Sequence, residues 1–168
     1  MGTPLEIERK YVIELPQISA LSAMNDYTVS DIEQTYLESP AHVTRRVRAR
    51  RYSDRTVYTE TKKVRVDRMS SYEDEREISE REYSELLCRR KTDTVTLKKR
   101  RHTFLYEGQI FEVDVYPEWK RSAILETELK TRESEVIFPD FIRIIAEVTG
   151  EKKYSNAAMS REFPPELV

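Results

Sequence analysis

The chain has 168 residues, of which 36% are charged and 38% hydrophobic, and its 29 basic and 31 acidic side chains leave a net charge of −2. With three glycines, two histidines and one cysteine, it contains no glycine-rich phosphate loop, no HExxH or three-histidine zinc site, and no intrachain disulfide. Any catalysis must therefore rely on Glu, Asp, Lys and Arg.

Several features predict a soluble cytoplasmic protein. The chain becomes charged almost at its N-terminus, and no apolar run approaches the ~20 residues that span a bilayer. The single cysteine fits a reducing compartment. The length suits one core, so we expect a single domain over residues 1–168 that makes no membrane contact.

Alternation of charged and apolar side chains with a period of two, typical of β-strands, recurs along the chain. It predicts eight strands, at residues 5–13, 31–37, 44–50, 56–64, 72–78, 94–105, 110–116 and 123–130. Helices are predicted at residues 18–24, after Ser79, which forms a capping box with Glu82, and at residues 139–148, which begin with proline and end before Gly150. The elements indicate a mainly β, α+β fold in which an antiparallel sheet curls and a few helices pack outside it.

Acidic and basic side chains fall on different strands. The acidic faces carry Glu6/Glu8, Glu73/Glu75/Glu77, Glu112/Asp114 and Glu126/Glu128, and the basic faces carry Arg46/Arg48/Arg50, Lys62 and Lys99/Arg101. One such strand would normally face water. Repetition on six or seven strands instead favours a closed eight-stranded antiparallel barrel with a wide hydrated lumen, because each unpaired ion in a dry core costs several kcal/mol.

This mixture of charges suits one kind of ligand. Clustered Arg and Lys bind phosphate oxygens through charge-assisted hydrogen bonds, and clustered carboxylates bind Mg²⁺ or Mn²⁺, which also bridge to phosphates. Acidic pairs at positions i and i+2 of a strand project to the same side, about 7 Å apart, so both can reach one hydrated ion. The sequence therefore predicts a metal–polyphosphate site.

The segment Glu6-Ile7-Glu8-Arg9-Lys10 resembles the ExExK signature of the CYTH, or triphosphate tunnel metalloenzyme, superfamily. Further segments resemble the motifs of that family in its order: Gln34–Leu37, Arg46–Arg48, Thr61-Lys62, Glu73–Ile78, Lys99–Arg101, Phe111–Asp114, Leu125–Glu128, and Val148-Thr149 with Lys153–Asn156. The resemblance covers Glu6 to about Asn156 and is strongest to the small bacterial inorganic tripolyphosphatases.

The resemblance implies a tunnel that binds a triphosphate with a divalent cation, and the charges suggest individual roles. The metal ligands would be Glu6, Glu8, Glu126 and Glu128, with Mg²⁺ or Mn²⁺ as the cofactor. The phosphate-binding residues would be Lys10, Arg46, Arg48, Lys62, Lys99 and Arg101. Glu73, Glu75 and Asp114 would act with Lys10 in catalysis, holding a second ion or orienting the attacking water. Positioning and charge stabilisation supply most of the acceleration in phosphoryl transfer.

Three departures from the family pattern leave choices open. Glu60 lies two residues before Lys62 and would add a negative charge to the tunnel. The run Lys98–Arg101 could point inward through Lys99 and Arg101 or through Lys98 and Arg100. Glu73, Glu75 and Glu77 offer three carboxylates where the motif needs two.

Inorganic triphosphate is the expected substrate, and the main alternatives are a class IV adenylate cyclase or a hydrolase of nucleoside or thiamine triphosphate, which share the tunnel. A non-catalytic polyphosphate sensor is a third interpretation. The basic stretch at residues 45–68 would also suit a nucleic-acid-binding module, but the net charge of −2 and the strand alternation argue against it. A homodimer is compatible with this architecture.

Overall fold

In the computed structural model, which describes residues 5–167, nine strands, three short α-helices and one 3-10 helix follow one another along the chain. Their bounds are β1 Leu5–Glu14, α1 Ile18–Ser22, β2 Asn25–Leu37, β3 Thr44–Arg51, β4 Thr56–Arg65, β5 Ser70–Ile78, α2 Glu80–Leu87, β6 Leu97–Tyr106, β7 Gln109–Val115, β8 Ser122–Glu128, β9 Ile144–Glu147, η1 Lys152–Tyr154 and α3 Asn156–Met159. All eight predicted strands are present. Within these residues no helix is both long enough and apolar enough to cross a bilayer.

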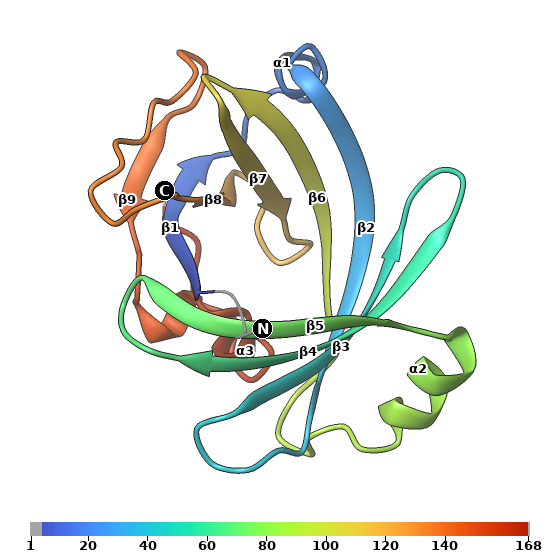
Figure 1. Cartoon of the computed structure of the whole chain (residues 1–168). Coiled ribbons are helices and arrows are strands. Elements are labelled where there is room, and N and C mark those ends of the chain that lie inside the picture. The colour runs from blue at the N-terminus through green and yellow to red at the C-terminus, as the bar shows by residue number, and fades with distance from the viewer. Residues whose placement is uncertain (1–4, 168) are drawn as a thin grey trace.

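Eight of the strands form a closed antiparallel ring in the order β5-β4-β3-β2-β6-β7-β8-β1 (Figure 1). The ring closes where the first residues of β1 pair with β5, with Leu5 opposite Tyr72 and Ile7 opposite Ser70. Further along β1, residues from Glu8 to Glu14 pair with β8. The predicted ring of eight antiparallel strands around a lumen is thus confirmed, and it is the pairing of β5 with β1 that encloses the interior.

The prediction of a helix at residues 139–148 is wrong. Ile144–Glu147 form β9, which pairs with β1 beyond the point where β5 ends, with Tyr11 opposite Glu147. The reason is tertiary: this edge of β1 has backbone groups that need partners, and β-branched Ile144 and Ile145 suit a strand. Gly150 does not end a helix either; its φ of +76° falls in a turn where a Cβ would lie 2.7 Å from Cβ of Arg68.

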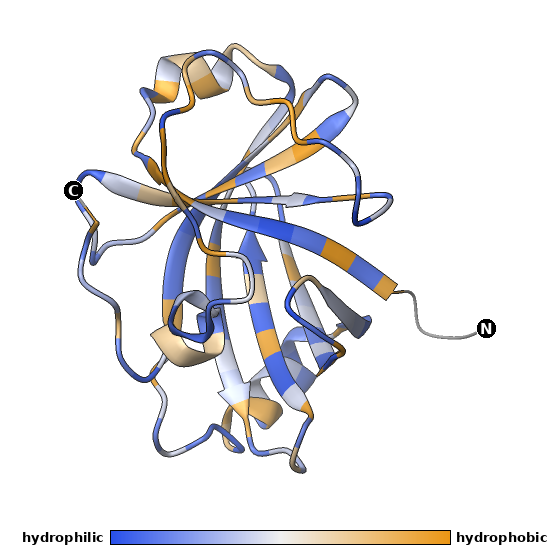
Figure 2. Ribbon diagram, turned by 90° about the vertical axis from the view of Figure 1, so that its left-hand side faces the viewer, coloured by the Kyte–Doolittle hydropathy of each residue, from blue (hydrophilic) through white to orange (hydrophobic). Residues whose placement is uncertain are grey.

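Hydrophilic and hydrophobic residues alternate along the strands (Figure 2), and the apolar faces pack outward under short covering segments. On β3 and β5, Val47, Ala49 and Ile78 pack against Tyr83 and Leu86 of α2. As predicted, Ser79 caps this helix: its Oγ accepts a hydrogen bond from the backbone N–H of Glu82 at 3.1 Å. A larger cluster on β1, β6, β7 and β8 lies under α1 and the segment 136–142. Covering the outer wall in this way leaves the inner wall to charged side chains.

One end of the interior is filled by a third apolar cluster. Val12, Tyr116 and Ile124 project inward there and pack with Trp119 and Tyr154. The C-terminal segment holds this cluster in place: the Trp119 indole N–H donates to the carbonyl of Pro164 at 2.9 Å, and the Tyr116 hydroxyl donates to Asn156 Oδ1 at 2.7 Å. The charged part of the lumen therefore has a dry, packed floor.

Candidate functional site

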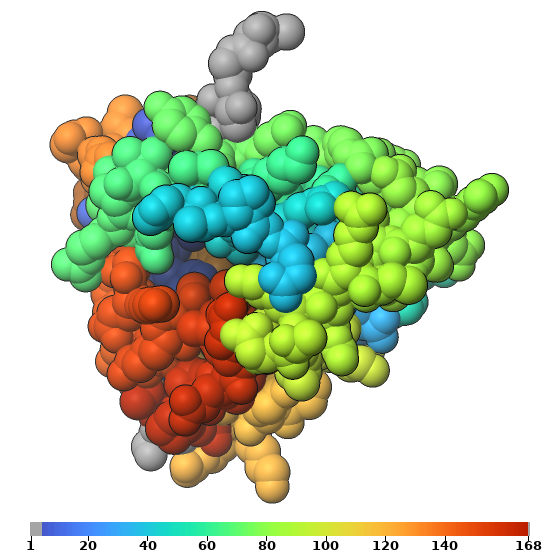
Figure 3. Space-filling view, turned by 90° about the horizontal axis from the view of Figure 1, so that it is seen from below, coloured from blue at the N-terminus to red at the C-terminus, as the bar shows by residue number. Residues whose placement is uncertain are grey.

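A cavity of about 1970 Å³ occupies the interior of the ring. All eight strands of the ring contribute to its walls, and the β2–β3 and β4–β5 loops and the C-terminal segment contribute to its rim. Figure 3 looks into this opening, which is bordered by the β2–β3 loop (cyan), the β4–β5 loop (green) and the C-terminal segment (red), with dark blue atoms of β1 visible in its depth. The lumen is thus an open, hollow site rather than a packed core.

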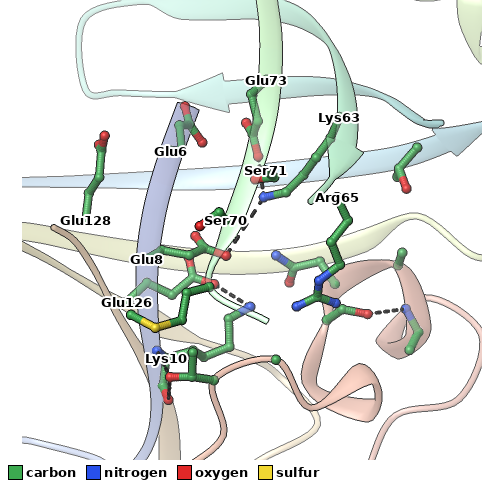
Figure 4. Close-up of a pocket in the computed structure, with 18 of the residues that line it drawn as sticks. Glu6, Glu8, Lys10, Lys63, Arg65, Ser70, Ser71, Glu73, Glu126 and Glu128 are labelled. Atoms are coloured by element: carbon green, nitrogen blue, oxygen red, sulfur yellow. Dashed lines mark hydrogen bonds and ion pairs between the residues drawn. The ribbon is translucent and has the colours of Figure 1, made fainter. Parts of the chain in front are cut away.

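Most of the charged residues singled out from the sequence line this cavity. The set comprises Glu6, Glu8, Lys10, Arg46, Arg48, Glu73, Glu75, Arg101, Glu126 and Glu128. Alternation along each strand brings them to one side; on β1, for example, Glu6, Glu8 and Lys10 face inward while the residues between them face outward (Figure 4).

Lys62 does not line the cavity, contrary to the prediction that it binds phosphate there. It lies exposed on the outer face of β4, and its neighbours Lys63 and Arg65 line the cavity instead. Thr61 points inward and donates from Oγ1 to Glu75 Oε2 at 2.7 Å. Both faces of β4 are polar, so the alternation of polar and apolar residues does not reveal which face turns inward, and a shift of one residue exchanges the two faces.

Glu60 also lies outside the tunnel, so it adds no negative charge to the lumen. Its buried carboxylate accepts hydrogen bonds from Arg45 Nε at 2.5 Å and from Arg76. Burial raises the pKa of Glu60, but these two arginines lower it by more, so the pKa lies below its ordinary value. The extra acid is therefore a structural ion pair of the outer wall.

Lys99, Arg101 and Asp114 form a buried ion network below the cavity wall. The side chains of Lys99 and Asp114 have no solvent exposure, and Lys99 Nζ lies 2.5 Å from Asp114 Oδ2. Arg101 binds the same carboxylate with Nε at 2.7 Å and Nη2 at 2.8 Å. The inward register of this run is thus Lys99 and Arg101. Burial opposes ionisation of Asp114, yet Arg101 and Lys99 hold its pKa below the usual range.

The same network extends to Glu126, one of the four acids expected to bind metal. Arg101 also pairs with Glu112 and with Glu126 Oε2 at 3.0 Å, and Lys10 Nζ lies 2.6 Å from Glu126 Oε1. Lys99 is the least stabilised cation here: burial first, and then Arg101, lowers its pKa to about 8. Lys99 and Asp114 therefore fix Arg101 in place, and neither reaches the lumen as the sequence suggested.

We expect Asp114→Asn to destabilise the fold by about 3–5 kcal/mol, because it leaves Lys99 and Arg101 buried without their shared carboxylate. The free energy of unfolding in urea measures the effect, and Asp54→Asn, which alters an exposed ion pair with Arg55, should change it by less than about 1 kcal/mol. The lowered pKa makes this stabilisation complete above the ordinary Asp value of about 4 and lost only below it. A D114N protein as stable as the wild type would contradict the network's importance.

Arg48 differs from Lys10, Lys99 and Arg101 because it has no carboxylate partner among residues 5–167. Its Nε and Nη2 donate to Oε1 of Gln34 at 3.2 and 2.9 Å. Gln34 in turn donates from Nε2 to the Tyr36 hydroxyl at 2.7 Å, which fixes the orientation of the amide. Burial, then Arg46 and Arg101, lowers the pKa of Arg48 to about 10. A neutral amide thus positions Arg48 without cancelling its charge.

Arg46 is only weakly neutralised. Its Nη2 lies 3.4 Å from Glu73 Oε2, and its buried Nε has no hydrogen-bond partner within the described part of the chain. Arg46 and Arg48 together form a buried pair of guanidinium groups whose positive charge is incompletely compensated. Anions with several oxygens, phosphates above all, satisfy such a pair.

Carboxylates gather on the facing wall. Burial, and after it the nearby Glu73, Glu128 and Glu8, raise the pKa of Glu6 to about 7, while Lys63 lowers it. Lys63 pairs with Glu73 and lies 3.8 Å from Glu8 (Figure 4). Within residues 5–167 no three such side chains already stand at metal-binding spacing. The donor set nonetheless suits a hard divalent cation, because the carboxylates of Glu6, Glu8 and Glu128 share too little positive charge.

Sequence comparisons detect no relative: no protein-family model and no curated protein matches the chain. Solved structures do match. The inorganic triphosphatase NE1496 is 25% identical to this chain, and the alignment covers 95% of this chain and 97% of that one with a TM-score of 0.59. This chain has the CYTH fold, as the sequence resemblance predicted. PH1012 from Pyrococcus horikoshii OT3 shares the fold at 24% identity; the alignment covers 76% of this chain and 79% of that one, with a TM-score of 0.58. HpAC1 from Hippeastrum, an adenylyl cyclase candidate with a dominant triphosphatase activity, shares it at 18% identity. That alignment covers 76% of this chain and 81% of the other, with a TM-score of 0.53.

The CYTH fold of this chain also contains functional candidates that the sequence did not single out. Lys63 and Arg65 were missed because of the register of β4, although the spacing of Thr61 and Lys63 is a Thr-x-Lys pattern that could have revealed it. The sequence marks Gln34 only as part of a motif. Its role depends on which side chain lies opposite on β3, namely Arg48, and the ladder between β2 and β3 decides this.

Proposed function

We propose that this chain hydrolyses inorganic triphosphate in its tunnel with the help of Mg²⁺ or Mn²⁺. The observation that carries the proposal is the pairing, inside one cavity, of incompletely neutralised Arg46 and Arg48 with a carboxylate cluster around Glu6 and Glu8. Overall similarity to NE1496, an inorganic triphosphatase, over nearly the full length of both chains supports the same activity.

The roles of the side chains follow from their charges. Arg46 and Arg48 bind the phosphate oxygens and stabilise charge on the leaving phosphate, with Lys63 and Arg65 at the side of the cavity. Glu6, Glu8 and Glu128 would hold the cation, which when bound neutralises phosphate charge and activates water. Glu126 serves mainly to position Lys10 and Arg101, its two ion-pair partners.

Two further acids have positioning roles. Glu73 pairs with both Arg46 and Lys63, so it aligns these two cations toward the substrate. Glu75 accepts a hydrogen bond from Thr61 and has no ion-pair partner within residues 5–167, which leaves it available to orient the attacking water. Glu73 and Glu75 thus both belong to the proposed site, and Glu73 acts by positioning Arg46 and Lys63.

The proposal is tested by measuring phosphate release from tripolyphosphate with Mg²⁺, with Mn²⁺ and with EDTA. We expect turnover only with the metal ion, and Glu8→Gln should weaken the apparent metal affinity by at least about tenfold. Glu14→Gln is the matched control, because Glu14 lies exposed at the far end of the same strand. Metal-independent turnover, or an equal loss in both variants, would refute the proposal. Stabilisation by tripolyphosphate without turnover would indicate a polyphosphate sensor instead.

A nucleoside or thiamine triphosphate is the second candidate substrate. The cavity volume of about 1970 Å³ exceeds the ~300–1,000 Å³ typical of sites for drug-sized ligands, so it has room for an organic group beside the phosphates. Offering ATP and identifying the products separates the cases: ADP and phosphate indicate hydrolysis, whereas cyclic AMP and pyrophosphate indicate a cyclase.

A nucleic-acid-binding function has less support. The basic residues of the stretch 45–68 divide between two faces. Arg46, Arg48 and Arg50 line the cavity. Arg45, which also borders the cavity, and Arg51 pair with Glu60 and Glu33 of the outer wall. This division leaves no uniform basic outer surface over β3, as a phosphate backbone would require.

A further inference from the structure

A second cavity, of about 630 Å³, lies on the outer face of the ring where β5 and β9 meet β1. It is lined by Arg9, Asp67, Arg68, Met69, Arg132, Glu147 and Thr149. Arg9 reaches it because it alternates with the inward-facing Glu8 and Lys10 and so projects from the opposite side of β1.

The charges around this outer cavity are incompletely balanced. Asp67 is engaged by Arg132, which also donates to Ser70 Oγ at 2.8 Å. Glu147 accepts a hydrogen bond from Thr149 Oγ1 at 2.9 Å. Within the described part of the chain, the Arg68 side chain donates only to the backbone carbonyl of Thr149, at 3.0 Å, so no carboxylate neutralises its positive charge.

Arg9 is the least satisfied group. Within residues 5–167 it takes part in no ion pair, and its buried Nε has no hydrogen-bond acceptor. A buried N–H without an acceptor is costly, because it has lost its hydrogen bond to water. An acceptor arriving from solvent would remove this cost.

We propose that this outer cavity binds a small tetrahedral oxyanion, orthophosphate, between Arg9 and Arg68, with Arg132 beside it. Guanidinium groups present parallel N–H donors that match the oxygens of a phosphate, and two of the three have no carboxylate competing for them. The site lies outside the tunnel, so its existence does not depend on the proposed hydrolysis.

The outer cavity and the tunnel share a wall. Arg68, Met69 and Thr149 border both cavities. Thr149 Oγ1 accepts a hydrogen bond from the backbone N–H of Lys10 at 3.0 Å, and Gly150 lies directly against Cβ of Arg68, which leaves no room for a side chain there. An anion held by Arg68 therefore lies one residue layer from Lys10 in the tunnel.

The test is a titration with sodium orthophosphate, without metal ions, followed by NMR of the backbone amides. We expect saturable shifts at Arg9 and Thr149 that persist in Arg48→Gln, and a dissociation constant about tenfold or more weaker in Arg9→Gln and in Arg68→Gln. Arg121→Gln, an exposed arginine away from the cavity, should bind as the wild type does. Shifts confined to the tunnel, or unchanged affinity in a folded R9Q or R68Q protein, would overturn the proposal.

Discussion

Replacing Arg48 with Gln is expected to lower kcat/KM for tripolyphosphate about 10²–10³-fold, the usual cost of removing one preorganised donor to a developing negative charge. Arg48 is the buried cation that faces the lumen with an amide, and no carboxylate, as its partner. Its charge is consequently available to the phosphates. Initial rates at saturating Mg²⁺ measure the loss. Arg51→Gln is the control, because Arg51 lies on the same strand and pairs with Glu33 outside the ring.

The substitution Gln34→Glu tests the same idea without touching Arg48. It keeps the shape of the side chain but places a carboxylate against the guanidinium, so the net positive charge facing the substrate falls. We expect a higher KM for tripolyphosphate and a smaller change in kcat, whereas Gln34→Met should both raise KM and lower kcat, because it releases Arg48 from its position. Wild-type kinetics in Q34E and R48Q, or an equal defect in R51Q, would show that Arg48 is not a principal phosphate ligand.

The second large effect is expected at Lys63, where replacement by Gln should reduce kcat/KM about 10–100-fold. Lys63 lies in the cavity between Glu73 and Glu8, so its loss removes a phosphate-binding charge and leaves two nearby carboxylates less well neutralised. The effect should appear both in KM for tripolyphosphate and in the Mg²⁺ concentration that gives half-maximal rate.

Lys62→Gln is the matched control, because it removes the same charge one residue away on the outer face of β4. Its kinetics should equal those of the wild type. The comparison therefore tests the register of β4 directly. If K62Q were the impaired variant and K63Q active, β4 would have to present its other face to the lumen.

The secondary structure was largely predictable because it depends on local patterns. Strict alternation marked eight strands, and Ser79 with Glu82 marked the start of α2. The helix predicted at residues 139–148 failed because its apolar residues fit either a helix or a strand. The free edge of β1, contributed by the other end of the chain, selected the strand.

The sequence alone also determined most of the charges that line the lumen, because one-sided charges repeated on so many strands favour a hydrated ring interior. What only the tertiary structure decided is which charges remain free. In the sequence, Lys99, Arg101 and Asp114 are candidates for the site just as Arg48 is. In the structure, Lys99 and Arg101 are paired with Asp114, whereas Arg48 contacts the amide of Gln34. Ion pairing across a sheet depends on strand order and register, and these follow from how the ring closes rather than from any single segment.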